Sequence, residues 1–195
     1  MSARRNPQPP PSMTPEQFLA WAAEYDMANV ALIDGEVVAM AGGTRNHIDI
    51  RGNIYRALGD ALAGKHDPCR AYVDGLAVVV SEGTTHIPDV VVDCASERGG
   101  EDLIAIGPVI VVEVLSRSTS RKDTDLELMN YFGVPSIFHY VIVNGFSRRI
   151  IHHRRDGEVM RTQILAEGVL TLDPPGIVLA IDDFWIGLPP KDAAA

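Results

Sequence analysis

Glu113 is an acidic residue inside the apolar, β-rich run VIVVEVL. A buried carboxylate without a partner is costly, so a residue of this type needs a reason to stand there. A second acid, Asp89, follows Pro88 and opens another β-rich run, VVVDC. If the two strands neighbour each other in one sheet, both carboxylates reach the same edge of that sheet.

Two carboxylates held close together repel each other unless one is protonated or a cation lies between them. Hard cations such as Mg²⁺ take oxygen ligands, often one or two carboxylates completed by water and substrate phosphate. Asp89 and Glu113 therefore suit a minimal metal site for phosphodiester chemistry. The alternative, which spacing alone favours, is that Glu113 points outward from a half-exposed strand or pairs with an Arg or Lys.

Helices and short strands alternate around these two acids. TPEQFLAW predicts a helix start, in which Thr14 caps, Pro15 takes the first helical position and Gln17 completes a capping box. The other predicted elements are a hairpin around Asp34-Gly35, a helix within 46–64, strands in AYV, LAVVV, PDVVVDC and VIVVEVL, a helix from about Ser120 to Gly133, a strand in HYVIVN, a hairpin around Asp156-Gly157, and terminal strands after Gly168. This order favours one mixed α/β or α+β domain around a single sheet.

Length and composition fit such a domain. The chain has 195 residues, 46% of them hydrophobic and 22% charged, which allows a sizeable core. We expect a Pro-rich flexible tail over 1–12, a single domain over 13–188 and a flexible tail over 189–195. No apolar run approaches the ~20 residues that span a bilayer, and the first residues lack a signal-peptide pattern, so no membrane partner is expected.

Net charge and cysteine content bear on nucleic-acid binding and on the redox compartment in which the protein is expected. The net charge of −9 argues against loose, charge-driven nucleic-acid binding but is compatible with a local basic groove. Cys69 and Cys94 match no zinc spacing. Two isolated cysteines without an export signal predict a reducing cytoplasm.

The segments PDVVVDC, PVIVVEVLSRST, YFGVPSIFHYVIVN and DPPGIVLAIDDFW, taken in this order, resemble the PD-(D/E)XK nuclease superfamily. Within it they are similar to the Uma-type restriction endonuclease family, and EVLSRST is the most specific piece. The resemblance covers roughly residues 14–186. It implies a restriction-endonuclease-like central mixed sheet flanked by helices, here with extra β-hairpins, and a divalent-metal site at the sheet edge.

The resemblance also implies roles for individual residues. Asp89 and Glu113 would be the metal-binding acids for Mg²⁺ or Mn²⁺, with the backbone carbonyl of Val114 as a further ligand. Glu36 and His47 would line the site. The candidates for contacts with DNA phosphates, in the loop after Glu113 and at the start of the following helix, are Arg117, Arg121 and Lys122.

One position departs from the family pattern. The superfamily carries a lysine two residues after the Glu, where this chain has Leu115, and the Uma-type family carries it in the next helix between an Asp and a Tyr. Asp123 and Tyr131 fit that frame, but the position between them is Glu127. Glu127 has the wrong sign to stabilise developing negative charge, so it is either another metal ligand or a sign of an impaired enzyme. Tyr131 has ordinary core packing as its alternative.

Two further candidate site features each have a functional and a purely structural interpretation. His47, at a helix start, is expected to be neutral and either serves the site or only covers the helix end. His152 and His153 stand among arginines in a segment that either faces phosphate or is a solvated hairpin.

The leading hypothesis is a metal-dependent DNA endonuclease, and the alternative is a non-catalytic or impaired accessory protein on the nuclease fold. A homodimer through an exposed strand edge is a weaker expectation.

Overall fold

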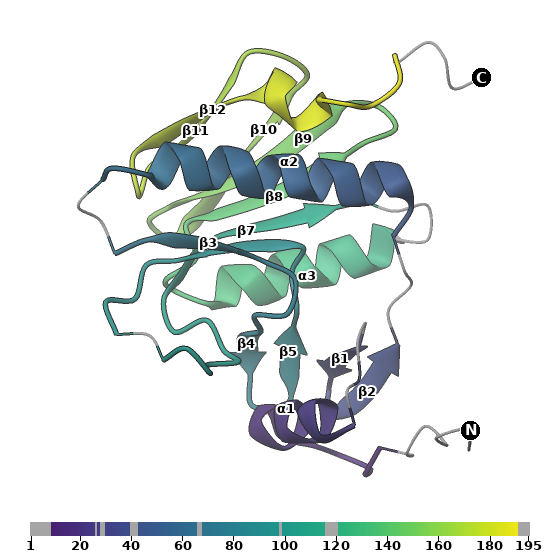
Figure 1. Ribbon diagram of the computed structural model, residues 1–195. Helices are drawn as coiled ribbons and strands as arrows, with labels where there is room; N and C mark the ends of the chain where they lie inside the picture. Colours follow the sequence, from purple (N-terminus) through teal and green to yellow (C-terminus); the bar gives the residue numbers. More distant parts are fainter. Residues whose placement is uncertain are drawn as a thin grey trace.

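A six-stranded sheet forms the centre of the protein in the computed structural model (Figure 1). The structure describes residues 9–25, 27, 30–39, 43–65, 68–97, 99–115 and 121–190, without the side chains of 39 and 121–124. The helices are α1 Pro15–Glu24, α2 Arg45–Leu62 and α3 Arg121–Gly133, with a short 3-10 helix, η1, at Ile181–Trp185. The strands are β1 Val30–Ile33, β2 Glu36–Ala39, β3 Arg70–Val73, β4 Val78–Ser81, β5 Thr84–His86, β6 Val90–Asp93, β7 Pro108–Val114, β8 His139–Asn144, β9 Arg149–Asp156, β10 Val159–Leu165, β11 Val169–Leu172 and β12 Ile177–Ala180.

The central sheet has the order β10-β9-β8-β7-β6-β3 and is mixed. β7 and β8 are parallel and are joined through α3, whereas the other neighbours pair antiparallel. A parallel pair needs such a crossover connection, which accounts for α3 lying against the sheet. The predicted central mixed sheet flanked by helices is confirmed, but the expectation of a single sheet is wrong, because a four-stranded and a two-stranded sheet also form.

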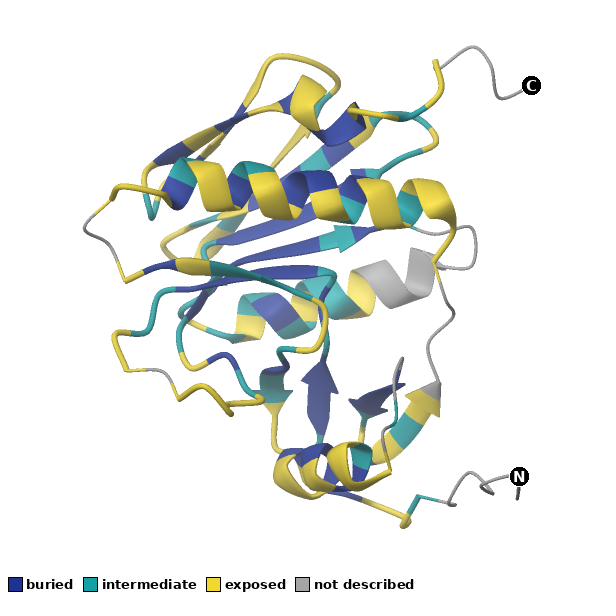
Figure 2. Cartoon of the chain, in the orientation of Figure 1, coloured by how far each residue is buried: buried dark blue, intermediate teal, exposed yellow. Residues whose placement is uncertain are grey.

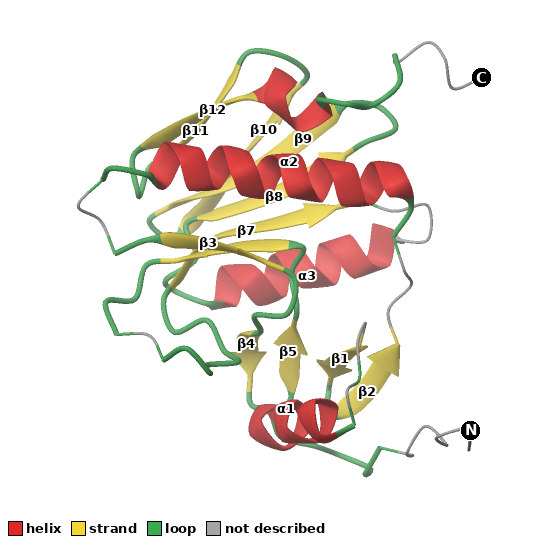
Figure 3. Cartoon of the chain, in the orientation of Figure 1, coloured by secondary structure: helices red, strands yellow, loops and turns green. Residues whose placement is uncertain are grey.

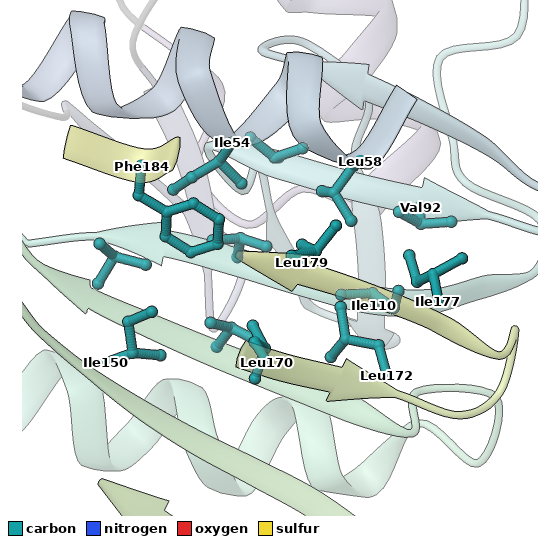
Figure 4. Close-up of a cluster of buried hydrophobic side chains, with 14 of the residues drawn as sticks. Ile54, Leu58, Val92, Ile110, Ile150, Leu170, Leu172, Ile177, Leu179 and Phe184 are labelled. Carbon is teal, nitrogen blue, oxygen red and sulfur yellow. The ribbon is translucent and has the colours of Figure 1, made fainter. Parts of the chain in front are cut away.

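The helix α2 covers one face of this sheet. Its Ile50, Ile54 and Leu58 are buried at helical spacing and pack on alternate residues of the central strands. Figure 4 shows Ile54 and Leu58 above Ile110, with Leu170, Leu179 and Phe184 closing the same cluster from the C-terminal strands and η1. This cluster fixes the position of α2, and with it that of the residues at the start of α2.

The helix α3 covers the opposite face. Val111 of β7 and Tyr140 and Ile142 of β8 alternate with the residues beneath α2, and they pack against Tyr131 of α3. In Figure 2 the middle strands are mostly dark blue, because both of their faces are covered. Glu113 shares the face of Val111 and therefore points toward α3.

A smaller four-stranded sheet, β2-β1-β5-β4, lies beside the first with α1 packed on it (Figure 3). The α1 capping box at Thr14, Pro15 and Gln17 forms as predicted. The hairpin of β1 and β2 turns at Asp34 and Gly35, both at positive φ, also as predicted. β5, with the sequence TTH, was not predicted: its pairing with β1 and β4 buries threonines that carry no local apolar pattern.

Cys69 and Cys94 form a disulfide, so the prediction that they are isolated is wrong. They stand just beyond the β3–β6 pair Arg70 and Asp93, where the antiparallel register brings them opposite each other. An argument for a reducing compartment therefore no longer follows from these cysteines, and the cytoplasmic location stays a prediction. In the part of the chain that the structure describes, no helix has the length and apolar character to cross a membrane.

Candidate metal centre

Asp89 and Glu113 lie side by side at one end of the central sheet. β6 and β7 pair with Val90 opposite Val112, so the next step of the antiparallel register places Asp89 opposite Glu113. Residues opposite each other in this way present their side chains on the same face. The backbone N–H of Val114 donates a hydrogen bond of 2.7 Å to Asp89 Oδ2 and fixes that carboxylate at the end of β7.

Two residues at the start of α2 reach the other oxygen of Asp89. His47 Nε2 lies 3.1 Å from Asp89 Oδ1, and Arg51 Nη1 lies 3.6 Å from the same atom. The two side chains are one helical turn apart and so share a face. Thr44 caps the helix by accepting from the His47 backbone N–H. The His47 Nδ1 atom is buried, and among the described residues it has no hydrogen-bond partner.

Two tyrosines hold the acids on the α3 side. The Tyr131 hydroxyl donates to Glu113 Oε1 over 3.0 Å, and the Tyr140 hydroxyl donates to Glu127 Oε2 over 2.9 Å. The tyrosine rings are 5.0 Å apart and both residues are buried. Tyr131 is thus a core residue and a partner of Glu113 at once, and the two interpretations of its role do not exclude each other.

Several carboxylates lie close together in this site and disfavour the ionised form of Glu113. Burial raises the pKa of Glu113 well above its ordinary value, and the nearby carboxylates of Glu127 and Asp89 raise it further. The Tyr131 hydroxyl and the Asp89 backbone act in the opposite direction on this pKa. Burial also raises the pKa of Tyr131, followed by the charges of Glu113 and Glu127, so its hydroxyl keeps its proton and remains a donor.

These residues suit a hard divalent cation. A cation between Asp89 and Glu113 would relieve the repulsion that raises the pKa of Glu113, and carboxylates are the ligands that Mg²⁺ and Mn²⁺ prefer. Within the described ranges, no three His, Cys, Asp or Glu side chains form a group that could hold an ion. An ion here would therefore rely on two carboxylates and complete its shell with backbone oxygen, water or substrate phosphate.

Other predicted site residues are not brought into this cluster. Glu36 is exposed on β2 of the smaller sheet, and no described contact joins it to Asp89 or Glu113. Arg117 lies outside the described residues. Arg121 and Lys122 begin α3, but their side chains lie outside the described part of the chain. All three stay predictions as DNA contacts.

Sequence reasoning missed Arg51 and Tyr140. Arg51 also contacts Asp74 Oδ2 at 3.4 Å, so it links two acids. Its spacing of one helical turn from His47 was a signal in the sequence, but that spacing gains meaning only once α2 is known to start beside Asp89. Tyr140 has no such signal, because its contact with Glu127 depends on how β8 packs against α3.

Comparison with known sequences shows to which family the chain belongs. The sequence model of the Uma2 family, described as "Putative restriction endonuclease", matches residues 15–182. The chain belongs to the Uma2 family. Its relatives include the uncharacterized protein slr1290 of Synechocystis sp., 29% identical over 96% of this chain and 99% of that protein, and sll1609 of the same organism, 23% identical over 69% and 78%.

The fold also matches a solved structure. The crystal structure of "a putative nuclease belonging to DUF820" from Anabaena variabilis aligns with a TM-score of 0.69 over 89% of this chain and 97% of that chain. The identity is 14%, so this likeness concerns the fold. Family and fold together are consistent with the PD-(D/E)XK superfamily and place this chain among nuclease-like proteins.

Proposed function

We propose that this Uma2 protein is a divalent-metal-dependent endonuclease that hydrolyses phosphodiester bonds in DNA. The observation that carries the proposal is the pairing of Asp89 and Glu113 across β6 and β7, with a Glu113 pKa raised by burial and by neighbouring carboxylates. Such an arrangement is unfavourable for a purely structural pair, and a cation would make it favourable.

The residues then take separate roles. Asp89, Glu113 and the carbonyl of Val114 would hold Mg²⁺ or Mn²⁺, which supplies charge neutralisation at phosphate and a more acidic bound water. His47 and Arg51 hold Asp89 in place through Oδ1. Tyr131 orients Glu113 through its hydroxyl. Partners of this kind fix the direction of a ligand and raise its affinity for metal.

Arg117, Arg121 and Lys122 would position the DNA backbone beside this centre. Phosphate contacts of this type give affinity that falls with salt. Replacing the three with Gln would then reduce both DNA affinity and its salt dependence.

The proposal also includes a cytoplasmic location and a homodimer. The dimer would form along the exposed strand β10, and light scattering of the purified protein tests this assembly.

The test is cleavage of plasmid and single-stranded DNA by purified protein with Mg²⁺ or Mn²⁺. Asp89→Asn and Glu113→Gln should each abolish cleavage, whereas Glu158→Gln, an equal charge change at an exposed turn, should leave it unchanged. Cleavage that persists in both site variants removes this mechanism.

A second candidate function is a non-catalytic accessory protein on the same fold. Glu127 favours it, because a carboxylate bound to the Tyr140 hydroxyl stands where the family frame carries a basic group. With this function, the protein would not bind Mn²⁺ and would not cleave DNA. Glu127→Lys separates the two: cleavage gained by this change would show that only the basic group was lacking.

A further inference from the structure

A second polar site lies on the outer strands of the central sheet, away from the two acids. A hollow of about 530 Å³ is lined by His152, Arg154, Arg161, Thr162 and Gln163 of β9 and β10. Two of these five residues are arginines and none is acidic, in a chain whose net charge is −9. From its sequence, this charged hairpin either faces phosphate or is a solvated hairpin.

Strand register explains how these residues meet. Arg161 stands opposite Arg154, and Arg154 stands opposite His139 on β8. One step along the same face, Gln163 stands opposite His152 and His152 opposite Val141. Two arginines directly opposite each other on antiparallel strands repel, which costs stability unless an anion lies near. Arg161 forms an ion pair with Asp156, and the charge of Arg154 also helps to lower the pKa of Asp156, although Arg154 itself makes no ion pair within the described residues.

The floor of the hollow is a chain of neutral hydrogen-bonding groups. Gln163 Nε2 donates to His152 Nδ1 over 2.9 Å, so the proton of His152 is on Nε2 and points to His139 Nδ1, also 2.9 Å away. Burial lowers the pKa of His152 and of His139 to about 4, and the charge of Arg154 acts in the same direction. The histidines are therefore uncharged near neutral pH, and the positive charge of the site comes from the arginines.

The hollow is separate from the metal centre. Arg154 pairs with the first residue of β8, whereas Glu113 lies beside Ile142, further along that strand. His152 also alternates onto the face that α2 covers, since it pairs with Val141 of that core, and Glu113 faces α3. A ligand in the hollow would thus not touch Asp89 or Glu113.

We infer that the hollow on β9 and β10 binds a phosphate group through Arg154 and Arg161, with Gln163 as a neutral donor. Guanidinium groups match the oxygens of phosphate and form charge-assisted hydrogen bonds with them. This inference does not depend on the nuclease proposal. The phosphate has two chemical sources, a small phosphate compound or the backbone of a nucleic acid.

The test is titration calorimetry at constant ionic strength with inorganic phosphate, a deoxynucleoside monophosphate and a short single-stranded oligonucleotide. Arg154→Gln should weaken the binding of inorganic phosphate about tenfold, as the loss of one charge-assisted contact requires. Arg149→Gln is the matched control: it is an exposed arginine at the other end of β9, and its removal should change affinity less than about twofold. Asp89→Asn should leave phosphate binding unchanged even if it abolishes cleavage.

The ligands separate the two sources. If Arg154→Gln weakens the small phosphates and leaves the oligonucleotide unaffected, the site serves small phosphate compounds. If it weakens the oligonucleotide as well, the site holds a nucleic-acid backbone, and either result supports the inference. Absence of saturable phosphate binding by the wild-type protein, or equal weakening by Arg149→Gln and Arg154→Gln, would overturn it.

Discussion

At the scale of single residues, Glu113 is half-buried and has two carboxylate neighbours and one hydroxyl donor. In the metal-free protein this arrangement lowers the free energy of unfolding, and a bound cation would offset that loss. Glu113→Gln should therefore raise the free energy of unfolding of the metal-free protein near pH 8, by up to about 1.4 kcal/mol for each unit by which the Glu113 pKa is raised. Denaturant unfolding in the presence of a chelator measures this, with Glu158→Gln as the control. A less stable Glu113→Gln protein would contradict the account.

Tyr131 should behave in the opposite way. Tyr131→Phe keeps the buried ring but removes the hydroxyl that donates to Glu113 Oε1. Leaving a buried acceptor without its donor costs about 1–3 kcal/mol, and because Glu113 is only partly buried we expect a loss of stability at the lower end of this range. The loss should disappear in the background Glu113→Leu, because leucine offers no acceptor for the Tyr131 hydroxyl. Equal losses in both backgrounds would mean that the hydroxyl acts independently of Glu113.

The residue scale also shows what a sequence can reveal about a site. The strand ends at which Asp89 and Glu113 stand made their pairing possible, but spacing alone favoured an outward-pointing Glu113, and the resemblance to the Uma-type family favoured the pair. The cysteines could not be paired, because strand register sets their pairing, and Arg51 could not be placed, because its contacts depend on where α2 packs against the sheet. Register depends on side chains packing across the whole sheet rather than on local spacing.

At the scale of elements, α2 links the site to the C-terminal segment. Asn53 is buried in α2, and its Nδ2 donates to the backbone carbonyls of Phe184, over 3.2 Å, and Ile186, over 2.8 Å. Asn53→Asp keeps the shape but loses both donors, so we expect a loss of about 1–3 kcal/mol in the free energy of unfolding. Asn46→Asp, the same change at an exposed first-turn position of α2, should be neutral or slightly stabilising. Chemical denaturation of the two variants makes the comparison, and equal losses would contradict it.

Elements with strong local chemistry were predictable, and those defined by pairing were not. The capping box of α1 and the Asp34-Gly35 hairpin follow from residues near each other in the chain. β5 has only three residues, and its Thr84 and Thr85 are buried through contacts with β1 and β4. Nothing in TTH itself favours a buried strand, so tertiary pairing decides its structure.

At the scale of the whole molecule, buried neutral histidines predict an acid-sensitive fold. Burial lowers the pKa of His86, His139 and His152 from 6.5 to about 4. Between these values the unfolded chain binds protons that the folded protein does not. Stability should therefore be complete above pH 6.5 and fall toward pH 4, by up to about 1.4 kcal/mol per pH unit for each histidine.

Unfolding measured from pH 7 to pH 4.5 tests this slope against His152→Leu. The difference between the two proteins isolates the histidine, because Glu113, whose raised pKa acts in the opposite direction, is common to both. The variant should show the shallower dependence on pH. Parallel curves would mean that His152 is not held neutral by the fold.

The most direct test of the whole account is a titration of the protein with Mn²⁺, followed by calorimetry. The account predicts one ion per chain in the wild-type protein and no binding at that site in Asp89→Asn or in Glu113→Gln, with Glu158→Gln behaving as the wild type. Mn²⁺ binding that is equal in the wild type and in both site variants would contradict the claim that these two carboxylates hold the metal.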